Sequence, residues 1–286
     1  MVIKTKHTLF VLLIFTLSMF LFCSCSEPYD PAVVPETEIF SPIDIEDTVV
    51  TETYNMFKVR FADANDRGDL RTVDTNKDLF LNTYRTYCVT EKELTNQNKL
   101  FAIFSPIQAD EIKQTWAYEQ IDEPTLDYDG RVYYLETEQV EQMARELFGK
   151  AVNLTHEWPV AAIDKFLPSF NNGRYEWRDP NWGGDPVSWY FHVLISAEKS
   201  GNYLIIYDKY INGIPVDDDE IGLFYGDSEF VNSIEIPDEY KRNDYLLDYE
   251  KKDEVVLKYG TPYKHTFKLA EDGTYFWVSS EPINED

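Results

Sequence analysis

Positive charge is scarce in this sequence. Of its 286 residues, 26 are Lys or Arg and 52 are Asp or Glu, so the formal net charge is −26 at pH 7. A chain this acidic repels the phosphates of nucleic acids and the headgroups of anionic lipids. We therefore exclude a nucleic-acid partner and expect a solvated acidic surface, although the same charge would attract cations or basic proteins.

Cysteine is also rare, and it occurs only as Cys23, Cys25 and Cys88. Three cysteines cannot build the disulfide framework that stabilises many small exported domains. Cys88 lies in a segment rich in aromatic residues. We therefore expect a buried, unreactive thiol at this position and not a nucleophile.

Catalytic and metal-binding motifs are missing as well. His156, His192 and His265 occur in neither an H-E-x-x-H nor an H-x-H arrangement, so we expect no metal site. His192 lies in a strongly hydrophobic stretch, where a hydrogen-bonded structural role is expected. We assign no catalytic residue and no cofactor. Paired carboxylates for glycoside hydrolysis stay open, because 52 acidic residues offer too many pairs to choose from.

Three short patterns look functional but have simpler explanations. Ser196 and Lys199 match the S-x-x-K of penicillin-binding enzymes, yet the K-T-G-like match shares the same lysine, whereas those enzymes keep the two motifs far apart. Asp63 begins a stretch that partly resembles a calcium loop, but Arg67 stands where an oxygen ligand is required. Weak calcium affinity there stays open. The acidic run Asp217 to Glu220 is expected to be solvated.

The N-terminus has the pattern of an export signal. Lys4 and Lys6 precede an apolar run from Leu9 to Phe22 that is interrupted only by Thr16 and Ser18. A helix that spans a membrane usually needs roughly 20 apolar residues, and this run is shorter. A basic start followed by a short apolar core predicts a secretory signal peptide, which we place at residues 1–24.

The end of the apolar run resembles the lipobox of bacterial lipoproteins. In Phe22-Cys23-Ser24-Cys25, the small residue Ser24 precedes Cys25, whereas the bulky Phe22 precedes Cys23. The resemblance implies cleavage before Cys25 and lipid attachment to its thiol. It departs from the family pattern at Phe22, where Leu is usual, and an ordinary signal peptide or an uncleaved anchor are the alternatives. We expect an extracytoplasmic protein whose partner is the cell membrane or outer membrane, bound through lipid on Cys25.

The rest of the chain is expected to fold. Hydrophobic residues make up 43 % of the sequence and aromatic residues 15 %, which suits a sizeable core despite the charge. Residues 25–50 are acidic and contain prolines, so we predict a solvated tether. Residues 51–283 form the predicted globular region, as one large domain or two small ones with a sub-boundary near 150–172.

Periodicity predicts an α+β fold. Residues 138–148 form the clearest helix, because Val140, Ala144 and Leu147 fall on one face and Gly149 can end it. Further helices are expected over 109–118 and 249–259. Strands are expected over 54–61, 187–197, 203–211, 263–269 and 274–280, with turns at 198–202, at Asn212-Gly213 and at 270–273. Strand pairs mixed with helices outside a βαβ rhythm indicate antiparallel sheets, with two tandem α+β units as a further possibility.

The C-terminal hairpin carries a second resemblance. Tyr263-Lys264-His265-Thr266-Phe267-Lys268, followed by Asp272-Gly273 and Tyr275-Phe276-Trp277-Val278-Ser279-Ser280, is similar to the ending of a group of uncharacterised bacterial exported lipoproteins. The likeness covers about 25 residues. It implies an exported, anchored protein, and it implies no activity and no site residues.

A tryptophan-rich loop is the best candidate for ligand binding. Trp177, Trp182 and Trp189 lie in a stretch rich in Gly, Pro and Asp, and Trp182 stands between turn residues. Exposed aromatic rings beside carboxylates can hold sugar rings or peptides. The alternative is that these rings fill the end of a β-sheet core, as most aromatic residues do.

Two functions remain from the sequence. The first is a non-catalytic, membrane-tethered domain that binds an extracellular ligand or protein. The second is an extracellular hydrolase of glycan or envelope material, acting through carboxylates that the sequence does not single out. The lack of a nucleophile or metal motif favours the first.

Overall fold

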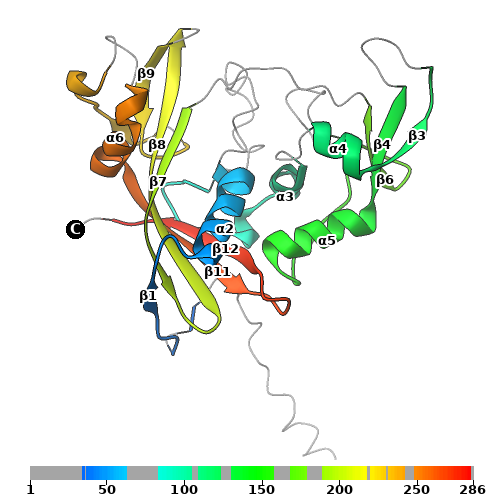
Figure 1. Ribbon diagram of the computed structural model, residues 1–286, viewed down its shortest axis with the longest axis horizontal. Coiled ribbons are helices and arrows are strands. Elements are labelled where there is room, and N and C mark those ends of the chain that lie inside the picture. Colours follow the sequence, from blue (N-terminus) through cyan, green and yellow to red (C-terminus); the bar gives the residue numbers. More distant parts are fainter. Residues whose placement is uncertain are drawn as a thin grey trace, which may run out of the picture. The chain divides into compact units, whose positions relative to one another are not determined.

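Two antiparallel sheets organise the chain, and they confirm the α+β prediction (Figure 1). The computed structural model describes residues 34–35, 37–62, 83–104, 109–123, 130–157, 168–178, 189–217, 220–229, 231–241 and 248–284. All of them belong to one unit, Val34–Asp286, which begins well before the predicted start at Thr51.

The larger sheet has eight strands, in the order β1-β7-β8-β11-β12-β2, with β9 paired to β8 and β10 paired to β9. The strands are β1 (Ser41–Ile43), β2 (Val89–Thr90), β7 (Trp189–Lys199), β8 (Tyr203–Asp217), β9 (Glu220–Tyr225), β10 (Ser233–Ile234), β11 (Thr261–Leu269) and β12 (Tyr275–Pro282). The smaller sheet has the order β3-β4-β6-β5. Its strands are β3 (Ala117–Gln120), β4 (Arg131–Glu136), β5 (Ser169–Asn171) and β6 (Arg174–Arg178).

Helices connect and cover the sheets. The α-helices are α2 (Thr48–Phe57), α3 (Asn96–Phe104), α4 (Ala109–Thr115), α5 (Thr137–Phe148) and α6 (Lys252–Tyr259). Short helical turns are the π-helix η1 (Lys58–Ala62) and the 3-10 helices η4 (Glu91–Glu93), η5 (Asp238–Tyr240) and η6 (Tyr249–Lys251). None of the helices in these ranges is long and apolar enough to cross a membrane.

The central strand β8 is buried on both faces because helices pack on both (Figure 1). Alternate residues of a strand point to opposite faces. Leu204 and Ile206 belong to the main core, which lies on the α2 side, whereas Ile211 belongs to a second core with Val255 and Val256 of α6. The main core also contains Tyr133, Leu135, Tyr175 and Trp177 of the smaller sheet, so it joins the two sheets.

The predicted strand over 54–61 is wrong, and so is the full length of the predicted tether. Residues 48–62 are helical, and β1 pairs with β7 inside the segment expected to be a solvated tether. Asp47 caps α2 by accepting a hydrogen bond from the backbone N–H of Val49. The buried residues Val50, Tyr54, Phe57 and Phe61 follow a helical period and not an alternating one.

The turn predicted at Asn212-Gly213 is also wrong. Both residues lie within β8, where they pair with Tyr190 and Trp189 of β7 and with Tyr225 and Phe224 of β9. An Asn-Gly pair favours a tight turn locally, but strands on both sides keep the backbone extended here. The expected helix over 109–118 ends at Thr115, because Ala117–Gln120 pairs with β4 as an edge strand.

Other local predictions are confirmed. α5 covers the expected face, and Gly149 at its end has φ 85°, a conformation that favours glycine. The helix over 249–259 occurs as η6 followed by α6. The hairpins β7–β8 and β11–β12 form as expected, with the second pair closed by the turn Ala270–Gly273.

Candidate functional site: a buried Asp–His–Ser cluster

Three neighbouring strands place an acid, an imidazole and a hydroxyl side by side on the α2 side of the larger sheet. Asp208 comes from β8, His265 from β11 and Ser280 from β12. The register pairs Tyr263 with Asp208 and His265 with Ser280. Paired residues share a face, so the three side chains converge over the middle of the sheet.

A β-bulge adds a fourth member to this cluster. The β11–β12 register shifts between Thr266 and Phe267, so that Val278 is the extra residue of β12. The shift brings Trp277 and Ser280 to the same face although they are three residues apart in sequence. As a result, Trp277 Nε1 donates a hydrogen bond to Ser280 Oγ at 3.0 Å.

The hydrogen bonds connect the members of the cluster in a chain. His265 Nε2 lies 3.0 Å from Asp208 Oδ1, and a carboxylate only accepts, so this nitrogen carries the proton. His265 Nδ1 lies 2.7 Å from Ser280 Oγ. Ser280 Oγ also accepts from the indole N–H of Trp277, so it lies between Trp277 and His265 Nδ1.

The second carboxylate oxygen of Asp208, Oδ2, accepts two hydrogen bonds. Tyr54 of α2 donates to Oδ2 at 2.8 Å, and Tyr84 donates to the same atom at 2.5 Å. The Tyr84 hydroxyl in turn lies 3.2 Å from His192 Nδ1, so His192 is hydrogen-bonded as expected. Asp208 thus accepts from Tyr54, Tyr84 and His265, and it connects α2, the segment before β2, and two strands of the sheet.

Burial sets the electrostatics of the cluster. Asp208, His265, Ser280 and Tyr84 are all 0 % exposed. Burial raises the pKa of Asp208, but the charge and hydrogen bond of His265, with further contributions from His192 and Tyr84, bring that pKa below its usual value. Burial and the adjacent Asp208 raise the pKa of Tyr84 well above its usual value. Asp208 is therefore ionised and Tyr84 protonated at neutral pH.

The cluster resembles a Ser–His–Asp triad in composition but differs in arrangement. In the serine hydrolase triad, Nε2 of the histidine faces the serine and Nδ1 faces the aspartate. Here Ser280 faces Nδ1 and Asp208 faces Nε2. A nucleophile must also reach a substrate carbonyl, and the Ser280 side chain is closed off from solvent. The hydrogen bonds to Asp208 therefore hold strands β8 and β11 against helix α2.

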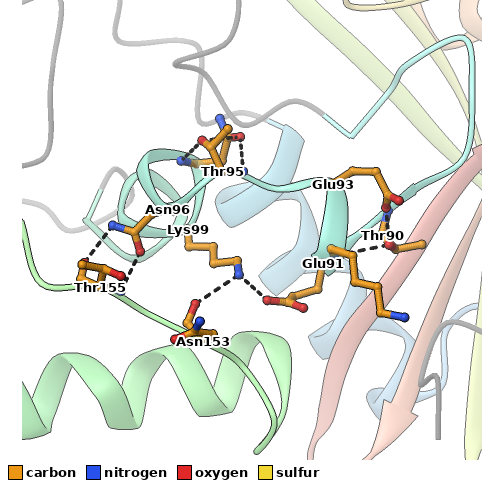
Figure 2. Close-up of polar contacts among 10 residues, drawn as sticks. Thr90, Glu91, Glu93, Thr95, Asn96, Lys99, Asn153 and Thr155 are labelled. Atoms are coloured by element: carbon orange, nitrogen blue, oxygen red, sulfur yellow. Dashed lines mark hydrogen bonds and ion pairs between the residues drawn. The ribbon is translucent and has the colours of Figure 1, made fainter. Parts of the chain in front are cut away.

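A second polar group is centred on the buried side chain of Lys99 and joins α3 to the segment that follows α5. Figure 2 shows the ammonium of Lys99 between the carboxylate of Glu91 and the backbone carbonyl of Asn153, which it donates to at 3.1 Å. Asn96 accepts from Thr155 N–H at 2.8 Å and donates to the Thr155 carbonyl at 2.7 Å. These bonds fasten α3 to the segment that follows α5. Lys99 and Asn96 bond to backbone carbonyls and to a carboxylate that is already paired, which indicates a structural role for this group.

Of the three tryptophans predicted to bind ligand, Trp177 has its side chain within the described residues. Trp177 is 3 % exposed and packs edge-on against Trp116, at 6.0 Å between ring centroids. Its ring therefore serves the core, which was the alternative explanation for this group. Trp189 begins β7, but its side chain lies outside the described residues, as does Trp182.

Several other predicted features also fall outside the described residues. They are Cys25, the segment of Asp63 and Arg67, and residues 218–219 of the acidic run. Within the described ranges, no group of three or more His, Cys, Asp or Glu side chains could hold a metal ion.

The prediction of a buried Cys88 is wrong, because this thiol is exposed. Partial desolvation and the carboxylates of Glu281 and Glu93 raise its pKa. A protonated thiol is a poor nucleophile, so the expectation of low reactivity stays physically reasonable.

Sequence reasoning missed Asp208 and Ser280. The usable signal was alternation: Leu204, Ile206, Asp208 and Tyr210 occupy successive positions of one strand face. A carboxylate inside such an apolar row is buried and requires donors. The row could have identified Asp208, but not the donors, which come from residues far away in the chain.

Comparisons with family models, curated proteins and solved structures gave no match for this chain. The fold class therefore rests on the structure itself.

Proposed function

We propose that this chain is an extracytoplasmic lipoprotein, anchored by lipid on Cys25, whose folded unit binds a ligand or a protein without catalysing a reaction. The observation that supports the non-catalytic part is the burial of Asp208, His265 and Ser280. All three are 0 % exposed and are engaged by one another or by Tyr54, Tyr84 and Trp277. A site that binds substrate needs polar groups facing a cavity, and these face each other.

The alternative is a hydrolase that uses Ser280 as its nucleophile. One observation favours it, because Ser280 Oγ lies within hydrogen-bond reach of an imidazole that is itself bonded to a carboxylate. A fluorophosphonate probe separates the two functions, since it labels activated serines covalently. We expect no labelling of the folded protein. Labelling that disappears in Ser280→Ala, but persists in a control such as Ser233→Ala, would establish the hydrolase.

The lipid anchor needs its own test. We expect radiolabelled palmitate to be incorporated into the protein in a bacterial host, and Cys25→Ala to abolish both incorporation and sedimentation with membranes. Cys23→Ala is the matched control and should leave both unchanged. Incorporation that survives Cys25→Ala but is lost in Cys23→Ala would place the lipid on the other cysteine.

A further inference from the structure

Two Asn-Gly pairs occur in this chain, and the fold places them in opposite surroundings. They are Asn172-Gly173 and Asn212-Gly213. Asparagine is a thermolabile residue, because the backbone nitrogen that follows it can attack its side-chain carbonyl carbon. A following glycine favours this attack, since it has no Cβ to shield the nitrogen or to restrict the backbone. Both pairs are therefore intrinsically susceptible to deamidation.

The first pair forms the exposed turn between β5 and β6. Asn172 has φ 50° and Gly173 has φ 83°, and positive φ at both central residues is typical of a tight hairpin turn. Both residues are exposed, and no atom lies within 4 Å of a Cβ built on Gly173. This open space allows the turn to rotate into the geometry that the reaction needs.

The second pair lies inside strand β8, between β7 and β9. Asn212 is opposite Tyr190 of β7 and Tyr225 of β9. In an extended strand, ψ is roughly +135°, which turns the next backbone nitrogen away from the side chain of the residue before it. The attack requires a large rotation about this bond, and pairing on both sides of β8 prevents it. Asn212 is also 0 % exposed, so water is kept away.

The side chain of Asn212 is poorly suited to carry a charge. Neither its Oδ1 nor its Nδ2 has a hydrogen-bond partner. A carboxylate at a buried position is stable only when donors compensate for its lost hydration. Asp208, on the same strand, meets this condition because Tyr54, Tyr84 and His265 donate to it. Within the part of the chain that the structure describes, no such donor bonds to Asn212.

We propose that Asn212-Gly213 is a deamidation site that the sheet keeps closed in the folded protein, and that its reaction prevents the chain from refolding. In the unfolded chain, the Gly213 nitrogen forms a bond to Asn212 Cγ, and the side-chain nitrogen leaves as ammonia. Water then opens the five-membered imide at either carbonyl and leaves aspartate or isoaspartate. The first product places an unpaired carboxylate at a fully buried position. The second adds a carbon atom to the backbone of β8.

Mass spectrometry of peptides from the full-length chain tests the closed state of the site. The protein is incubated at mildly alkaline pH with and without guanidinium chloride, and conversion is followed at both asparagines, so that Asn172 is the reference within the same molecule. We expect folding to slow conversion at Asn212 at least about tenfold and at Asn172 much less, because a turn opens more easily than a buried strand. Equal slowing at both positions, or none at Asn212, would overturn the closed site.

Refolding of the partly converted chains tests the consequence. After the denaturant is removed, gel filtration separates the folded protein from aggregates. We expect the folded fraction to retain chains modified at Asn172 but to be depleted at least about tenfold in chains modified at Asn212, since about 1.4 kcal/mol already changes a folding equilibrium tenfold. The same proportion of chains modified at Asn212 before and after refolding would overturn this part of the proposal.

Two matched variants provide an independent measurement. Asn172→Asp should fold with the urea midpoint of the wild-type protein, because its carboxylate is solvated. Asn212→Asp should yield little folded protein. An unchanged urea midpoint for Asn212→Asp would show that the buried position accepts the charge, and it would contradict the proposed block to refolding.

Discussion

Replacing Asp208 with Asn tests the role assigned to the buried cluster. The substitution preserves the shape of the side chain but removes the charge and turns one acceptor oxygen into an NH₂ donor. Asp208 accepts from Tyr54, Tyr84 and His265, so at least one of these donors would face another donor. The side chain is 0 % exposed, and water cannot compensate.

The expected loss is large for one substitution. Hydrogen bonds to charged groups contribute about 1.5–3 kcal/mol each, and disrupting a buried charged pair costs about 3–5 kcal/mol. We therefore expect Asp208→Asn to lower the free energy of unfolding by about 3 kcal/mol. Urea unfolding followed by tryptophan fluorescence measures this change. At an m-value of about 3 kcal/mol/M, the midpoint falls by about 1 M.

A surface substitution of the same kind provides the control. Asp122 is exposed beside β3, and Asp122→Asn should change stability by no more than about 0.5 kcal/mol. If Asp208→Asn behaved like Asp122→Asn, the carboxylate would not hold α2 and the strands together. That result would refute the structural role of the cluster.

The pH dependence of the same variant gives an independent check. The folded pKa of Asp208 lies below its ordinary value of 3.8, so its stabilisation is fully present above that value. It is lost as the pH falls through the folded pKa. The difference in unfolding free energy between the wild-type protein and Asp208→Asn should therefore be constant from pH 7 to about pH 5 and shrink below about pH 4.

Three further predictions concern other parts of the fold. Gly149 has φ 85° and ψ 170°, and a Cβ there would lie 2.7 Å from the Phe276 ring, so Gly149→Ala should cost more than the roughly 1–3 kcal/mol of backbone strain alone. Gly173→Ala, with φ 83° but no atom within 4 Å, reports that strain by itself in thermal unfolding. Trp177→Ala should lower the free energy of unfolding by about 3–5 kcal/mol, because it truncates a core residue. An unchanged urea midpoint would show that Trp177 is not part of the core. Burial raises the pKa of Tyr175 and Tyr207 to about 12, so the stabilisation they provide is present below pH 10 and lost above it. Absorbance at 295 nm should show these tyrosines ionising later than exposed ones, and a single transition near pH 10 would contradict it.

Helix α5 and the C-terminal hairpin show what could be predicted from local sequence. The apolar period of α5 and Gly149 after it lie within a dozen residues, and the turn Ala270–Gly273 directly joins β11 to β12. In such elements the residues that form the structure are neighbours in the chain. Tyr54 to Phe61 shows the limit, because its apolar residues suited either period until packing under the sheet selected the helix.

The candidate site was beyond prediction for the same reason. Its members come from α2, the segment before β2, and strands β7, β8, β11 and β12. Some of the residues that bond to each other are more than a hundred positions apart in the chain. A register between strands and one bulge bring them together, and neither is encoded in a short motif. Asn212-Gly213 makes the same point, since only the strands on both sides keep it extended.

The sequence by itself determined the acidic character and the elements whose partners are adjacent in the chain, and it predicts an export signal with lipid on Cys25. Only the tertiary structure decided that Asp208, His265 and Ser280 meet in a closed interior and that Trp177 belongs to the core. It also decided that Ser41–Ile43 pairs with β7 as an edge strand of the larger sheet. Charge, hydrophobic periodicity and turns are properties of neighbouring residues, whereas burial depends on what distant segments cover, and that is settled only when the sheets and helices pack.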